Sequence, residues 1–177
     1  MAAQNGHHAI IEALLNLAVV GALGPRRVLT LFQVQNSMGN PLLHQVAETG
    51  DRAILSVIFN RDVCIALGRD VFLNLLQVED RQGRTLLQAA VQNSRRDVFQ
   101  AVLVTDGIDL VDRAAFVRLL TNAMATAYRV GNREDCQFFI TQIRDLALAQ
   151  RISQWEMTDI LAQLDWSSWF QSWSLAF

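Results

Sequence analysis

The sequence predicts an all-α protein that is built from repeated helix–turn–helix units. Hydrophobic residues make up 51% of the chain, and they recur at helical spacing in short blocks separated by polar turns. Two segments, residues 36–60 and 80–104, share one pattern: a polar turn with a glycine, an apolar helix, a polar break and a second apolar helix. Because a single short helix pair cannot bury both of its faces, such units stack on neighbours.

Each unit opens on a side chain that can accept hydrogen bonds from the backbone of a turn, Asn36 in the first and Asp80 in the second. A glycine follows three residues later in both, where a positive φ has no steric cost. Pro41 suits the start of a helix because it has no N–H to leave unpaired there, and the Thr85 hydroxyl can cap. The apolar faces that we expect on these helices are Leu42, Leu43, Val46 and Ala47, and Leu86, Leu87, Ala90 and Val91.

The turn and the helix that follows it resemble the ankyrin repeat, which carries the pattern Gly-x-Thr-Pro-Leu-His-x-Ala. The matching residues are Gly39, Leu43 and His44 in the first unit, and Gly83, Thr85, Leu87 and Ala90 in the second. Pro41 and Leu42 stand where the family has Thr and Pro, and Gln88 replaces the histidine. The resemblance covers about a third of the chain. It implies a stack of helix pairs whose turn tips and inner helices form a concave surface for a protein partner.

The two units lie further apart than this resemblance implies. Asp80 follows Asn36 by 44 residues, whereas ankyrin repeats are about 33 residues long. We therefore expect an insertion of about 11 residues between the repeats, within residues 62–78. The inserted helices would either shape an extra binding lobe or only add to the core.

The remaining segments complete one predicted domain of residues 1–177. Residues 9–34 are expected to form a degenerate N-terminal helix pair, and residues 112–149 a divergent, longer pair. The sequence Ser153-Gln-Trp-Glu156 is a capping box, which predicts that a last helix begins there.

The last segment, residues 153–177, places three tryptophans on one helical face: Trp166, Trp169 and Trp173. This helix either caps the stack or docks a protein partner through its aromatic side chains. Insertion into a membrane interface ranks third, because the helix offers no Lys or Arg on its polar face.

Composition argues against several other classes of protein. The net charge of −2 and the lack of a basic block give no reason to expect a nucleic-acid partner. Cys64 and Cys136 lack the density and spacing of a disulfide scaffold or zinc site, so reduced thiols in a cytoplasm are the simpler interpretation. No apolar run is long enough for an integral membrane helix, and no secretory leader is visible.

No catalytic, cofactor-binding or metal-binding residues are expected. The only histidines are His7, His8 and His44, and adjacent histidines on a helix do not share a face. Phosphate-loop, zinc-protease and hydrolase motifs are absent. A small helical enzyme that uses Cys64 is kept as the third alternative for function.

All fifteen basic residues are arginine. A GC-rich genome that favours Arg codons explains this, and so does selection against ubiquitination, for which Lys is the usual acceptor. The second explanation would suit a bacterial effector that acts in the cytosol of a eukaryotic host, or a component of a ubiquitin-ligase complex.

We therefore expect a non-catalytic protein-interaction module that binds a protein partner through its turns. The candidate contacts are Met38, Asn40, Arg81, Gln82 and Arg84, which the core does not need in this interpretation. The alternative is an adaptor or a homodimer that self-associates through Trp166, Trp169 and Trp173.

Overall fold

The structure, a computed structural model, describes residues 13, 16–104 and 111–162. Within these ranges the chain forms α-helices and no strand, which confirms the all-α prediction. An isolated β-bridge joins Gln35 to Pro41. No described helix is both long enough and apolar enough to span a membrane.

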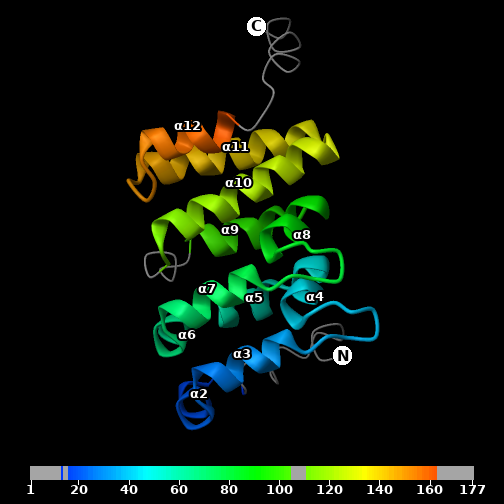
Figure 1. The fold of residues 1–177 in the computed structure, drawn as a ribbon, viewed down its shortest axis with the longest axis vertical. Coiled ribbons are helices and arrows are strands. Elements are labelled where there is room, and N and C mark those ends of the chain that lie inside the picture. Colours follow the sequence, from blue (N-terminus) through cyan, green and yellow to red (C-terminus); the bar gives the residue numbers. More distant parts are fainter. Residues whose placement is uncertain (1–12, 14–15, 105–110, 163–177) are drawn as a thin grey trace, which may run out of the picture.

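The helices stack along the long axis of the molecule, with α2 and α3 at one end and α11 and α12 at the other (Figure 1). In chain order they are α2 (Leu17–Leu23), α3 (Pro25–Gln33), α4 (Leu42–Thr49), α5 (Arg52–Ile58), α6 (Arg61–Leu67), α7 (Arg69–Gln77), α8 (Leu86–Gln92), α9 (Arg96–Val104), α10 (Arg113–Val130), α11 (Arg133–Leu148) and α12 (Gln154–Ala162).

The helices from α2 to α9 form two copies of one four-helix unit. Helices α2 to α5 make the first copy and α6 to α9 the second, and each helix begins 44 residues before its counterpart. Every helix of the first copy also contacts its counterpart: α2 with α6, α3 with α7, α4 with α8, and α5 with α9. The spacing of 44 residues is therefore the length of the repeating unit.

This arrangement corrects the interpretation of residues 62–78 as an insertion. The segment lies in α6 and α7, whose counterparts in the first copy are α2 and α3. Their ends agree closely. Gly24 and Gly68 stand before α3 and α7 with φ of 80° and 78°. The N–H groups of Val34 and Val78 close these helices with bonds of 3.3 and 3.4 Å to the carbonyls three residues earlier. The segment is repeated rather than inserted, and it builds core.

The core runs through the stack without a break. The two copies differ in burial at the end of the stack that α2 and α3 form. Phe72 on α7 is fully buried, and its ring meets that of Phe59 edge to face at 6.2 Å. Leu75 on the same helix is 2% exposed. Its counterpart Leu31 on α3 is 41% exposed, because among the described residues no earlier copy covers that face of α3.

The third copy diverges because its turn is missing. Helix α10 begins 44 residues after α7 and buries Phe116 at the position of Phe72. The whole helix runs for 18 residues, from Arg113 to Val130, without a break. Met124 and Ala127 stand where Asp80 and Gly83 form the turn of the second copy. Since neither favours a turn and Ala is the best helix former, the chain stays helical, and α10 packs on α8.

The predicted capping box forms and opens α12. The Ser153 N–H donates to Oε2 of Glu156 at 2.6 Å, and the Glu156 N–H donates to the Ser153 hydroxyl at 3.2 Å. Arg113, at the start of α10, donates to the same carboxylate at 2.8 and 2.9 Å. These contacts fix α12 on α10 and α11, which it packs against. Residues 163–177 lie outside the described part of the chain.

Replacing Phe72 by alanine tests whether α6 and α7 belong to the core. We expect Phe72→Ala to lower the free energy of unfolding by about 3–5 kcal/mol, because it leaves a cavity between stacked units. Leu31→Ala, at the exposed end, should cost under about 1 kcal/mol. Urea denaturation followed by circular dichroism measures both. Similar small losses would mean that α6 and α7 are peripheral.

Candidate functional site

The first turn is held by one side chain. Oδ1 of Asn36 accepts the backbone N–H groups of Met38 at 2.9 Å and Asn40 at 3.0 Å. The N–H of Asn36 donates in turn to the carbonyl of Asn40 at 3.0 Å. A side chain that captures the N–H two residues on is the usual way in which Asn and Asp form turns. Hydrogen bonds within the turn therefore hold the backbone near Met38 in one conformation.

The second turn repeats this geometry 44 residues later and adds a charge pair. Oδ1 of Asp80 accepts the N–H groups of Gln82 at 2.8 Å and Arg84 at 3.0 Å. The guanidinium of Arg84 bridges to the other carboxylate oxygen at 2.7 and 2.5 Å. Burial alone would raise the pKa of Asp80, but the hydrogen bonds from Arg84 and Gln82 outweigh it and hold that pKa below its usual range.

The two turns lie against each other. A Cβ atom at Gly39 would come within 3.2 Å of Cβ and Cδ of Arg81, so the stem of Arg81 rests on the first turn. Nε2 of His44, on α4, lies 2.7 Å from the carbonyl oxygen of Arg84 and donates to it. These contacts fix the spacing between the tips, which form one edge of the stack (Figure 1).

Two of the predicted contact residues point back into the unit. Nδ2 of Asn40 donates to Glu48 on α4 at 2.9 Å, and Nη1 of Arg84 donates to Gln92 on α8 at 2.6 Å. The pairs are equivalent by 44 residues, and both tie a turn to the helix that follows it. The expectation that the fold does not need Arg84 is therefore wrong, since this side chain joins Asp80 to α8.

The other three predicted contacts are exposed at the tips. Met38 is 54% exposed, and Arg81 and Gln82 are exposed beside it on the second turn. The structure thus brings Met38, Arg81 and Gln82 together on one edge, which we call the turn face. Trp166, Trp169 and Trp173 lie outside the described residues.

One exposed aromatic residue was not predicted as a contact. Trp155, near the start of α12, is 81% exposed. The capping box predicts where α12 begins, but it does not indicate which residues of the helix face α10 and α11.

His44 is buried at the junction of the two copies. Burial lowers the pKa of His44, against the opposing effects of its hydrogen bond to the Arg84 carbonyl and the negative charge of Asp80. Its Nδ1 is buried and has no hydrogen-bond partner, so a proton on that atom would leave an unpaired donor. Gln88, at the equivalent position, also links its helix to the next unit, because its side chain donates to Thr126 on α10 at 3.3 Å.

Both cysteines belong to the hydrophobic core. Cys64 and Cys136 are both buried, and burial together with the neighbouring Asp135 raises the pKa of Cys136 to about 11. A thiol with such a pKa is neutral at physiological pH and is a poor nucleophile. Within the described ranges, no cluster of three or more His, Cys, Asp and Glu side chains could hold a metal ion.

Comparison with known proteins does not place the chain in a family. No protein-family model, curated protein or solved structure matches the chain. The turn face is accordingly defined by its own geometry: two turns of the same construction, in contact, with three side chains that face outward.

Variants of Asp80 distinguish two contributions of this side chain to stability: its acceptance of the turn N–H groups and its charge pair with Arg84. We expect Asp80→Asn to cost about 1–2 kcal/mol of stability, because the amide oxygen can still accept the turn N–H groups but the charge pair is lost. Asp80→Ala should cost about 3 kcal/mol, since it removes the acceptor of the two turn N–H groups as well as the charge pair. Denaturation midpoints at neutral pH measure the difference. Equal losses would show that the turn N–H acceptor contributes nothing.

The burial of His44 predicts a loss of stability in mild acid. Because the fold disfavours the charged imidazole, its contribution is complete above the unfolded pKa of about 6.5 and falls as pH drops below that value. His44→Gln, which copies the second unit, should remove this pH dependence. The measurement is the free energy of unfolding at pH 7.5 and 5.5 for both proteins. An equal fall in the variant would assign the effect to other groups.

Proposed function

We propose that this protein is a non-catalytic protein-binding module whose partner docks on the turn face. The observation that carries the proposal is the close contact of two turns with the same hydrogen-bond pattern, with Met38, Arg81 and Gln82 exposed at their tips. Their backbones are held by hydrogen bonds within each turn, and Arg81 rests on Gly39. A surface that is already ordered loses little conformational entropy when it binds.

The chemistry of the turn face suits a protein partner. Methionine adapts its shape to apolar partners, arginine is enriched at protein interfaces and can grip a carboxylate with two hydrogen bonds, and Gln82 offers both a donor and an acceptor. Because the turn face carries a single exposed cation, we propose a mixed apolar and polar epitope rather than a highly charged one.

The resemblance to ankyrin repeats supports this proposal. His44, which matches the histidine of the family pattern, links α4 to the next turn at 2.7 Å. Helices α4 and α8 follow the turns directly, and we propose that they form the concave binding face that the resemblance implies. The unit of 44 residues is longer than the family's, so we propose an ankyrin-like stack in which each unit has an additional helix pair.

The cellular setting is part of the proposal. A chain with fifteen arginines and no lysine offers no lysine side chain to ubiquitin ligases. This composition supports a bacterial effector that binds a host protein in the cytosol, and it agrees equally with codon bias.

Reversing one charge on the turn face tests the proposal. Arg81→Glu should weaken capture of the partner from a eukaryotic cell lysate by about tenfold, whereas Arg144→Glu, on the exposed surface of α11, should not. Quantitative mass spectrometry of proteins retained on the immobilised chain measures both. Arg84 is unsuitable for this test, because its reversal would disrupt the second turn.

Circular dichroism of each variant checks that the protein remains folded. Retention of the same partner at the same level by the wild type and by Arg81→Glu would overturn the assignment of the turn face.

A further inference from the structure

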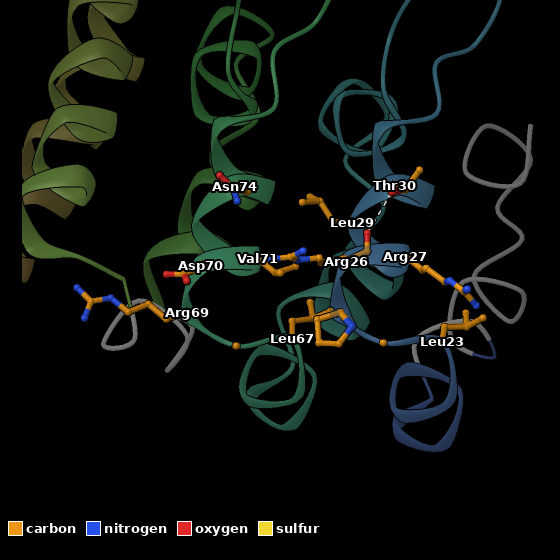
Figure 2. A pocket seen from close by; sticks show the side chains of 13 residues that line it. Leu23, Arg26, Arg27, Leu29, Thr30, Leu67, Arg69, Asp70, Val71 and Asn74 are labelled. Carbon is orange, nitrogen blue, oxygen red and sulfur yellow. Dashed lines mark hydrogen bonds between the residues drawn. The ribbon is translucent and has the colours of Figure 1, made fainter.

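A second surface lies on the edge of the stack opposite the turns. Each unit contains an elbow between two helices, at Gly24 between α2 and α3 and at Gly68 between α6 and α7. An open groove of about 1260 Å³ runs between these elbows (Figure 2). Both glycines have positive φ, and a Cβ atom at either would meet nothing within 4 Å. The groove exists because two units stack while their elbows carry no side chain.

The walls of this elbow groove are largely apolar. They come from both units, so an occupant would touch two copies of the repeat at once. The apolar lining residues are Leu23, Pro25, Leu29, Leu67 and Val71.

Three arginines line the same groove. Figure 2 shows Arg26 extending from α3 across the groove toward Val71 on α7, while the side chains of Arg27 and Arg69, which line its two ends, extend outward in opposite directions. Asp70 is the one carboxylate among the lining residues. Arg69 contacts Asp112 at 3.4 Å, but both side chains are more than half exposed, and such pairs contribute little. The groove therefore has an excess of positive charge.

The first unit does not neutralise this charge itself. Arg26 and Arg27 are the only charged residues between positions 16 and 47. The first carboxylate after them, Glu48, accepts a hydrogen bond from Asn40 in the turn. No carboxylate of the described residues forms an ion pair with either arginine.

We infer that the elbow groove binds an acidic, leucine-rich segment of another protein. Leucine-like side chains fit the apolar walls, and carboxylates match the guanidinium groups, which can bind them with two hydrogen bonds each. A nucleic acid matches the charge but not these walls, and the chain as a whole carries a net charge of −2. This site is separate from the turn face, so it stands whether or not the turn face binds a partner.

Peptide titration tests this inference. The probe is a fluorescein-labelled peptide of about 12 residues in which leucine and glutamate alternate in pairs. A matched peptide has serine for leucine, and another has glutamine for glutamate. Fluorescence anisotropy gives the affinity, and amide chemical shifts of the full chain, a protein of 19.9 kDa, locate the site.

We expect the leucine–glutamate peptide to bind in the micromolar range, to shift amides around Leu29 and Val71, and to bind more weakly as salt rises. The Arg26→Glu/Arg27→Glu variant should weaken binding by about tenfold or more. The Arg118→Glu/Arg144→Glu variant, with both changes on exposed helix surfaces, has the same net charge but leaves the groove and the turn face intact, so it should bind as the wild type does. Circular dichroism checks the fold of both.

The inference is overturned by any of four results: no binding up to about 1 mM peptide, equal binding to the Arg26/Arg27 variant, equal binding of the serine peptide, or shifts confined to another face. Displacement of the peptide by a single-stranded oligonucleotide of similar length at equal concentration would instead assign the groove to nucleic acid.

Discussion

The fold depends on one local interaction, the capture of two backbone N–H groups by a single side-chain oxygen at the start of each turn. Asn36 and Asp80 each provide this oxygen, and the chain then reverses from one helix pair to the next. The third copy provides an internal comparison. With Met124 in the place of Asp80 and Ala127 in the place of Gly83, the same stretch of chain runs on as helix α10. The turn residues thus decide between a compact four-helix unit and a continuous helix.

Stacking of these units creates two edges of different chemistry. At one edge the turns are filled by their own hydrogen bonds, and Met38, Arg81 and Gln82 are exposed at their tips. At the other edge a Cβ atom at either glycine elbow would meet nothing within 4 Å, and an open groove lies between the elbows. Arg26 and Arg27, which have no carboxylate partner among the described residues, border that space. A rigid tip and an open groove are suited to different ligands, which is why we assign them separate partners.

Much of the local structure could be predicted from the sequence. The helical spacing, both turns and the capping box at Ser153 and Glu156 all depend on residues close together in the chain. The spacing of 44 residues was visible as well, but its comparison with a shorter family unit suggested an insertion. The correct interpretation required the contacts of α2 with α6 and of α3 with α7, which join segments far apart in sequence.

The roles of individual arginines show the limit of sequence analysis. Arg81 and Arg84 look alike in a polar turn, yet one is exposed and the other joins Asp80 to Gln92. Likewise, Arg26 and Arg27 are an ordinary pair on a helix until α7 is placed beside them. The sequence by itself determined the helices, the turns and the polarity of each face, because these follow from neighbouring residues. Only the tertiary structure decided which charges are neutralised, which apolar positions are covered and where a groove opens, because each depends on what the neighbouring unit brings into contact.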